Sequence, residues 1–265
     1  MSMKTYYNNT IALITGASSG IGREMALQLA ALGSKPVLVA RRKDRLEQLA
    51  DEIKTKFGIE SLILASDLSK PHAAAALYSA VQEAGLKPDI LINNAGFGFQ
   101  GGFLKGDART YHEMTMLNMT ALTELTYFFL PAMVEQKKGG ILNVASMAGF
   151  APIPYFAVYA ATKSYVNSFG CALWHEMKDC GVHVTTLCPG PVQTEFFEVS
   201  GAKPQDLPVR NIQTAREVSE TGLKALSKNE MLVPTSTTLK VMSKISALVP
   251  LKANMSTAAS FMKDT

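Results

Sequence analysis

The chain has 265 residues, of which 47% are hydrophobic and 18% charged, and its formal net charge is +4. A globular chain of this length buries a large core, so it needs neither a disulfide framework nor a structural metal to fold. The basic residues are spread along the sequence and form no long block, which argues against a nucleic-acid-binding tail.

Cysteine and histidine usage argues against a metal site. The three cysteines have no paired spacing and the four histidines are scattered, which predicts reduced thiols and no bound metal. Residues 1–10 lack the apolar core of a signal peptide. The uncharged stretch 145–162 contains Gly149, Pro152 and Pro154, so it is not one membrane-spanning helix. We therefore expect a cytoplasmic protein with no integral membrane segment.

Short apolar runs alternate with helical patterns along the chain. In chain order, strands are predicted at 11–14, 36–40, 62–65, 90–92, 140–145 and 182–187. The helices predicted between them cover about 21–32, 46–57, a segment that begins near 71, 111–136 and 159–178. Strands without polar alternation are typical of a parallel sheet covered by helices on both faces. We predict an α/β fold, a single doubly wound (Rossmann-type) parallel sheet, in one domain over residues 1–265.

A glycine-rich turn, Thr15-Gly-Ala-Ser-Ser-Gly-Ile-Gly22, joins the first predicted strand to the first predicted helix. Glycines there allow the backbone to approach a pyrophosphate, and the helix N-terminus offers N–H groups to that anion. The spacing Gly-x-x-x-Gly-x-Gly is not the usual dinucleotide fingerprint, and no Lys-Ser/Thr pair follows as in a Walker loop. Its place between a strand and a helix nevertheless predicts a dinucleotide site.

The end of the second predicted strand indicates which dinucleotide is bound. An NAD-selective site carries a carboxylate about 20 residues past the turn, on the ribose 2′-hydroxyl. This chain has Arg41 and Arg42 there, and a guanidinium grips a 2′-phosphate with two hydrogen bonds. We therefore predict a preference for NADP(H). The alternative is a solvated basic start to the next helix, and Lys43 and Arg45 fit that interpretation.

Tyr159 and Lys163 lie four residues apart, on one face of a predicted helix. A free tyrosine titrates near pH ~10, and a nearby cation lowers that pKa toward the range that acid–base catalysis requires. Ser146 lies just past the fifth predicted strand, where its hydroxyl is expected to hydrogen-bond a substrate oxygen. Taken alone, each of these residues also has a structural interpretation, as a core tyrosine, a solvated lysine or a capping serine.

Four segments together resemble the short-chain dehydrogenase/reductase family, over about Thr10 to Thr194. They are the glycine turn, Asp67-Leu68, Asn93-Asn94-Ala95-Gly96 and Pro189-Gly-Pro-Val-Gln-Thr194. The resemblance implies an adenine contact at Asp67-Leu68, a structural turn after the fourth strand and a segment beside the nicotinamide after the sixth. The implied cofactor-binding residues are Gly16, Ser18, Ser19, Gly20, Ile21, Gly22, Arg41, Arg42, Asp67, Leu68, Asn94, Ala95, Gly96, Tyr159, Lys163, Pro189, Gly190, Val192 and Thr194.

The same resemblance implies a catalytic tetrad of Asn118, Ser146, Tyr159 and Lys163. Tyr159 is then the proton donor in carbonyl reduction. Lys163 lowers the Tyr159 pKa and holds the nicotinamide ribose, while Asn118 anchors a water that relays protons to Lys163. The family commonly pairs subunits through the helices that carry Asn118 and Tyr159, so a homodimer or homotetramer is expected.

The predicted function is hydride transfer between NADP(H) and a carbonyl or secondary alcohol. Two alternatives, a cofactor-binding sensor without chemistry and a methyltransferase on a similar sheet, do not account for the Tyr159/Lys163 pair. Apolar side chains in loops expected near the nicotinamide predict a lipophilic ketone, such as an acyl chain, a steroid-like or an aromatic compound. These side chains are Phe97, Phe99, Phe103, Phe150, Ile153, Tyr155, Phe156, Phe196 and Phe197.

Two C-terminal segments are expected to act near this pocket. Residues from about 191 to 215 contain Gly201, Pro204 and Pro208 and are predicted to form a substrate lid. A helical extension is predicted over about 236–265. It is basic and amphipathic, and we favour packing over the pocket or against another subunit, with binding to a membrane surface as the alternative.

Overall fold

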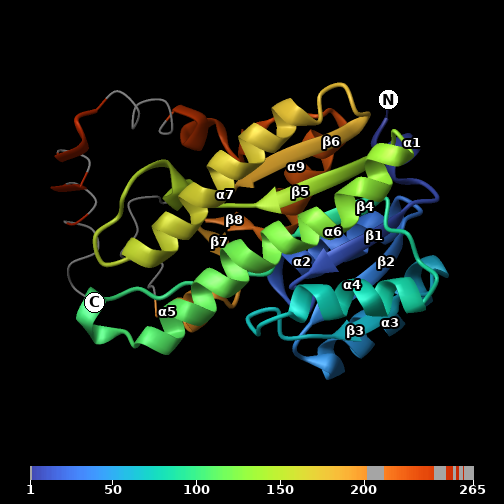
Figure 1. The fold of residues 1–265 in the computed structure, drawn as a ribbon, viewed down its shortest axis with the longest axis horizontal. Helices are drawn as coiled ribbons and strands as arrows, with labels where there is room; N and C mark the ends of the chain where they lie inside the picture. The colour runs from blue at the N-terminus through green and yellow to red at the C-terminus, as the bar shows by residue number, and fades with distance from the viewer. Residues whose placement is uncertain (1, 202–211, 242–248, 253–254, 257–258, 260–265) are drawn as a thin grey trace.

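The computed structural model describes residues 2–201, 212–241, 249–252, 255–256 and 259 (Figure 1). Seven strands form one parallel sheet in the order β3-β2-β1-β4-β5-β6-β9. This arrangement confirms the predicted doubly wound α/β fold. The strands are β1 (Ile11–Thr15), β2 (Lys35–Ala40), β3 (Leu62–Ala65), β4 (Ile90–Asn93), β5 (Gly139–Val144), β6 (Val182–Cys188) and β9 (Leu232–Pro234).

Helices cover both faces of the sheet. The face in front in Figure 1 carries α4 (Ala73–Glu83), α6 (Leu122–Glu135) and α7 (Ala157–Glu176). The other face carries α2 (Gly20–Ala31), α3 (Lys43–Phe57) and α9 (Ala215–Ser227). Shorter elements are α1 (Met3–Tyr7), α5 (Ala108–Thr115), α8 (Phe196–Ser200), the 3-10 turns Phe103–Lys105 and Met147–Phe150, and the strand pair β7 (Val192–Gln193) and β8 (Gln213–Thr214).

Each face of the sheet has its own buried apolar cluster, which explains why the strands are largely apolar. In β1, Ala12 and Ile14 pack toward α2 and α9, whereas Leu13 packs toward α4 and α6. All three side chains are fully buried. A strand covered on both sides has no solvent-facing position for a polar residue, so the absence of alternation follows from the fold.

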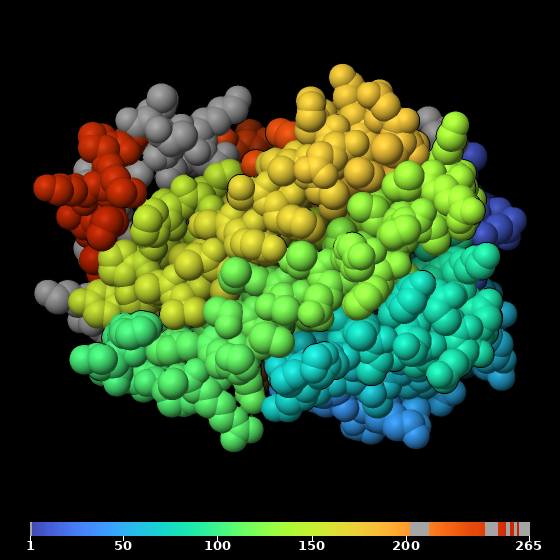
Figure 2. Space-filling model, in the orientation of Figure 1, coloured from blue at the N-terminus to red at the C-terminus, as the bar shows by residue number. Residues whose placement is uncertain are grey.

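The surface in Figure 2 lies over α4, α6 and α7, whose side chains pack closely along the front of the sheet. On α6, Phe128 stacks on Tyr78 of α4 with ring centroids 5.3 Å apart. The neighbouring Tyr127 side chain points outward and is 74% exposed.

No helix in the described part of the chain is both long enough and apolar enough to cross a bilayer.

The prediction of one continuous helix over 111–136 is wrong. The structure has α5, then a π-helical segment Met116–Ala121, and then α6. The π segment contains Asn118, whose side chain is held by backbone and side-chain hydrogen bonds described below. A π segment widens one turn while the chain stays helical, so the apolar pattern predicts a helix without showing where that turn lies.

The C-terminal third contains elements that the apolar patterns did not predict. α9 begins at a capping box in which Thr214 and Glu217 exchange side-chain and backbone hydrogen bonds, and β9 adds a strand beside β6. Of the predicted lid, residues 202–211 lie outside the described residues. So do 242–248, 253–254, 257–258 and 260–265 of the predicted extension, whereas 237–241 are helical.

Candidate active site

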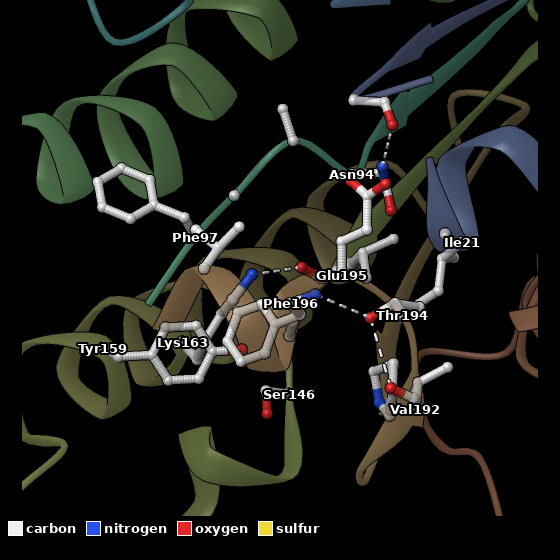
Figure 3. A pocket seen from close by; sticks show the side chains of 18 of the residues that line it. Ile21, Asn94, Phe97, Ser146, Tyr159, Lys163, Val192, Thr194, Glu195 and Phe196 are labelled. Atoms are coloured by element: carbon white, nitrogen blue, oxygen red, sulfur yellow. Dashed lines mark hydrogen bonds between the residues drawn. The ribbon is translucent and has the colours of Figure 1, made fainter. Parts of the chain in front are cut away.

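A cavity of about 550 Å³ opens where the carboxyl ends of β1, β2, β4, β5 and β6 meet (Figure 3). This edge lies where the strand order reverses between β1 and β4, which is where doubly wound sheets bind ligands. All the predicted cofactor-binding residues except Gly22 line the cavity, and all the predicted catalytic residues except Asn118 do so.

The glycine turn is joined to the turn after β4 by a compact hydrogen-bond network. Thr15 Oγ1 accepts from the backbone N–H groups of Asn94 and Ala95 at 2.9 and 3.0 Å. Asn94 Nδ2 donates to the Thr15 carbonyl at 2.8 Å. A Cβ on Gly22 would lie 2.4 Å from the Gly16 carbonyl oxygen, so Gly22 serves this close packing behind the cavity. The two turns are thereby locked together.

The first turn of α2 faces the cavity. Ser19 precedes the helix without capping it by its side chain, and Ser19, Gly20 and Ile21 all line the cavity. The backbone N–H groups at a helix N-terminus have no partner within the helix, and they carry the positive end of its dipole. This part of the cavity therefore suits a phosphate group.

Arg42 connects the glycine turn to Glu195, in the segment that follows β7. Its Nη2 donates to Ser18 Oγ at 3.1 Å and to Ser19 Oγ at 3.0 Å. Its Nη1 donates to Glu195 Oε2 at 2.8 Å, and Arg45 forms a second ion pair with Glu195. Arg45, which by its sequence position also fits a solvated helix start, thus has a specific partner, and sequence alone does not reveal Glu195 because the two residues are 150 positions apart.

Arg41 and Asp67 lie on the side of the cavity near the ends of β2 and β3. Burial raises the pKa of the Asp67 carboxyl, but hydrogen bonds from Ser69 and the charge of Arg41 outweigh it, and the net pKa is lowered. Asp67 therefore carries its charge at neutral pH, and its oxygen atoms accept hydrogen bonds.

Tyr159 and Lys163 project from α7 into the inner part of the cavity (Figure 3). Both are buried, with side chains 6% and 5% exposed. Lys163 Nζ donates to the Val144 carbonyl at 2.8 Å and lies 5.8 Å from the centroid of the Tyr159 ring. The Tyr159 ring contacts Phe156 and Phe196, with centroids 4.4 and 5.3 Å away. The phenol and the ammonium thus share one apolar-walled space.

Burial, and not the neighbouring cation, dominates the Tyr159 pKa in this arrangement. Burial raises the pKa of Tyr159 to about 12, and hydrogen bonding with Ser146 acts in the opposite direction. The expected lowering of the Tyr159 pKa by Lys163 is therefore not found. The loss of solvation destabilises the phenolate more than the neighbouring groups stabilise it. Burial lowers the pKa of Lys163 to about 8. At neutral pH the phenol keeps its proton, as a proton donor must.

Ser146 and Asn118 have different positions relative to the cavity. Ser146 lines it and accepts a hydrogen bond from the Ala148 N–H at 3.1 Å. Asn118 lies behind it, where Oδ1 accepts from Phe97 N at 3.1 Å and Nδ2 donates to Phe97 O and to Thr162 Oγ1, both at 3.0 Å. Asn118 thereby holds the loop after β4 against α7. A proton relay through a water at Asn118 stays a prediction.

The outer part of the cavity is apolar, but not all the predicted side chains form it. Phe99 and Phe103 instead pack on Tyr111, at 5.9 and 5.1 Å between ring centroids, and Tyr155 lies in a turn with a φ of 63°. Leu239, from the C-terminal segment, lines the cavity, and a Cβ on Gly190 would lie 2.9 Å from its Cδ1. The predicted residues that do line it are Phe97, Phe150, Ile153, Phe156, Phe196 and Phe197.

Comparisons with known proteins agree with this geometry. The very-long-chain 3-oxoacyl-CoA reductase of Homo sapiens is 32% identical over 96% of this chain and 82% of its own length. A short-chain dehydrogenase from Sphingobium yanoikuyae, solved in complex with NADPH, is 33% identical, with a TM-score of 0.82 over 90% of this chain and 92% of the other. A bulky-bulky ketone specific alcohol dehydrogenase from Comamonas testosteroni is 28% identical, with a TM-score of 0.78 over 91% and 92%.

Residues 10–205 match the protein family described as short chain dehydrogenase. The matched range includes the glycine turn, all four predicted catalytic residues and Glu195. It also covers most of the sheet and the helices on both of its faces. The chain belongs to the short-chain dehydrogenase/reductase family.

Proposed function

We propose that this chain is an NADPH-dependent oxidoreductase that reduces a lipophilic ketone to a secondary alcohol. The observation that carries the proposal is the position of Tyr159, a buried phenol beside Lys163 that opens into a cavity with aromatic walls. A protonated phenol in an apolar site is suited to donate its proton to an oxygen on which negative charge develops.

The residues of the cavity fit an NADP(H) molecule. The uncapped first turn of α2 suits the pyrophosphate, and Arg41 and Arg42 suit a 2′-phosphate. When bound, NADPH supplies the hydride that adds to the carbonyl carbon. NADPH is present in the similar structure from Sphingobium yanoikuyae, which further supports this choice of cofactor.

In the proposed reaction the residues of the chain donate one proton to the substrate oxygen and stabilise the negative charge that develops. Ser146 donates a hydrogen bond to the substrate oxygen, and Tyr159 transfers its phenolic proton to that oxygen as it gains charge. The ammonium of Lys163 stabilises the resulting phenolate, since an opposite charge in a water-poor site is strongly felt. The aromatic walls exclude water from the reacting atoms. Uptake of a proton at Tyr159 then restores the site.

The size and lining of the cavity support a substrate with a large apolar group. Phe150, Phe156, Phe196 and Phe197 present ring faces and edges that pack on hydrocarbon, and Leu239 adds an aliphatic contact. The similarity to a reductase of 3-oxoacyl thioesters favours an acyl chain, and the similarity to an enzyme for bulky ketones favours the same chemical class. We therefore propose a ketone that carries a long acyl or other bulky apolar substituent.

A substrate panel tests this proposal. NADPH absorbance is followed with 3-oxoacyl thioesters of increasing chain length, with bulky aryl ketones and with ketose sugars at equal concentrations. The expected result is a higher kcat/KM for the lipophilic ketones, rising with chain length. A higher kcat/KM on ketose sugars than on any lipophilic ketone would contradict the proposed substrate class but not the oxidoreductase assignment.

Assembly and location are separate proposals. The exposed Tyr127 on α6 lies on the face that we propose pairs subunits into a homodimer or homotetramer, and light scattering tests this. Cys171, Cys180 and Cys188 are free thiols, which supports a reducing, cytoplasmic location. Cell fractionation with a cytoplasmic marker tests the location, and recovery with a membrane fraction would contradict it.

A further inference from the structure

Glu195 places a carboxylate at the part of the cavity where positive charge is concentrated. It is the last residue before α8 and lines the cavity beside the glycine turn, where the preceding Thr194 faces Gly20. Its two oxygen atoms engage two different arginines, with Oε2 on Arg42 and Oε1 on Arg45. Hydrogen bonds from Arg45 and Arg42 hold the pKa of Glu195 below its ordinary value, so it is ionised at neutral pH.

The N–H groups of the Arg42 guanidinium have partners in two different segments, the glycine turn and the segment before α8. Nε and Nη2 point to the hydroxyls of Ser18 and Ser19, whereas Nη1 is committed to Glu195. Ser18, Arg42 and Glu195 all line the same cavity. A phosphate group that engages Arg42 through Nη1 and Nη2 shares Nη1 with Glu195, and both ligands are acceptor-only anions.

We propose that Glu195 is a further determinant of cofactor specificity, which competes with the 2′-phosphate of NADP(H) for Arg42 and so reduces the discrimination against NAD(H). The inference rests on the proposed NADP(H) preference. A dinucleotide without a 2′-phosphate leaves the Glu195–Arg42 pair intact and meets no added negative charge. A 2′-phosphate meets both the occupied donor and the repulsion of the carboxylate.

The solvent exposure of Arg42 and Glu195 limits how much their ion pair can change the Kd of NADPH. The side chains of Arg42 and Glu195 are 41% and 36% exposed, so solvent screens this ion pair considerably. Ion pairs of this exposure contribute at most about 1 kcal/mol, which corresponds to a change in Kd of about fivefold. Glu195 therefore adjusts the selectivity set by Arg41 and Arg42 and does not reverse it.

The test is a binding measurement that needs no turnover. The wild type and Glu195→Gln are titrated with NADPH and NADH, and also with the fragments adenosine 2′,5′-bisphosphate and 5′-AMP, which differ only in the 2′-phosphate. The variant keeps the side-chain length and removes the charge. We expect Glu195→Gln to bind NADPH and the bisphosphate about fivefold more tightly, with the Kd of NADH and 5′-AMP changed less than about twofold.

Glu198→Gln is the matched control. Glu198 lies one turn further along α8, is exposed, and forms no ion pair among the residues that the structure describes. The control makes the same chemical change on the same helix, so its Kd values should equal those of the wild type. An equal gain in Glu198→Gln would mean that general charge, and not the contact with Arg42, is responsible, and this would overturn the proposal.

The other possible results distinguish a failure of the proposed competition by Glu195 from a failure of the proposed NADP(H) preference. If Glu195→Gln binds the 2′-phosphorylated ligands with unchanged or weaker affinity while the wild type prefers NADPH, the competition is wrong and the NADP(H) preference stands. If the wild type does not prefer NADPH over NADH, the proposed cofactor preference itself is wrong, and the competition that rests on it is rejected too. Thermal unfolding of each variant checks that the fold is retained.

Discussion

Phe196 of α8 lies against Tyr159 of α7, with ring centroids 5.3 Å apart and ring planes tilted by 50°. Phe196 also reaches Gly98, where an added Cβ would lie 3.0 Å from its Cζ. It immediately follows Glu195, whose carboxylate pairs with Arg42 and Arg45. One short segment thus contributes both to the arginine-lined end of the cavity and to the surroundings of the Tyr159 phenol.

The Phe196→Ala variant is expected to lose kcat/KM on lipophilic ketones by about tenfold, because an aromatic contact is worth up to ~1.5 kcal/mol beyond its buried area. A small ketone such as acetone, which offers far less apolar surface to Phe196, serves as the control substrate and should lose much less. Equal losses on both substrates would show that Phe196 supports the catalytic geometry and not the substrate pocket.

The pH dependence of reduction should report Lys163. Burial lowers the pKa of Lys163 to about 8, so its positive charge is present below that pH and is lost as pH rises through it. We expect kcat at saturating NADPH to decline above about pH 8, since a neutral lysine no longer stabilises the phenolate.

The Lys163→Arg variant separates this group from others that titrate in the same range. An arginine stays charged throughout, so any activity that remains should show no decline near pH 8. A wild-type kcat that is constant from pH 6.5 to about 9.5, or a decline that Lys163→Arg leaves in place, would contradict the assignment to Lys163.

Cofactor choice should depend on Arg41. In Arg41→Asp a carboxylate replaces the guanidinium, so the 2′-phosphate is repelled while a 2′-hydroxyl gains an acceptor. We expect the Kd of NADPH to rise roughly 100-fold and that of NADH to stay equal or fall. Lys43→Asp, a similar charge reversal at a 69% exposed side chain nearby, is the control and should have little effect. Equal Kd values for both cofactors in the wild type would refute the preference.

Asn118 is predicted to contribute to stability as well as to activity. Asn118→Leu keeps the branched shape of the side chain but leaves the partly buried N–H and carbonyl of Phe97 without their side-chain partner. The free energy of unfolding in urea should fall by about 1–3 kcal/mol. Thr115→Val, which removes an exposed hydroxyl bond on α5, should change it by less than about 0.5 kcal/mol. Equal losses in the two variants would show that the contacts of Asn118 add no stability.

The sheet and the Tyr159/Lys163 pair could be predicted because short stretches of sequence determine them. Six strands appear as short, largely apolar runs, and each is followed by the polar or glycine-rich segment that borders the cavity. The spacing of Tyr159 and Lys163 puts them on one helix face regardless of what surrounds them. The capping box at Thr214 and Glu217 is an equally local signal for the start of α9, which apolar periodicity alone does not use.

Other features depend on tertiary contacts that no local pattern encodes. Arg42 and Glu195 are 153 positions apart, so the local sequence around either residue does not predict their ion pair. The raised pKa of Tyr159 follows from its burial beneath Phe156 and Phe196, which spacing to Lys163 does not reveal. Three of the predicted pocket residues, Phe99, Phe103 and Tyr155, are diverted by packing and turn geometry.

The most direct test of the account is ketone reduction by Tyr159→Phe, with the Kd of NADPH measured separately. The variant removes only the phenolic oxygen and keeps the ring packed between Phe156 and Phe196, so the fold should be retained. We predict that kcat falls by about 10²–10⁴-fold, the usual worth of a general acid, while the Kd of NADPH changes little. A correctly folded Tyr159→Phe that keeps more than about a tenth of the wild-type kcat would contradict the assignment of Tyr159 as the proton donor.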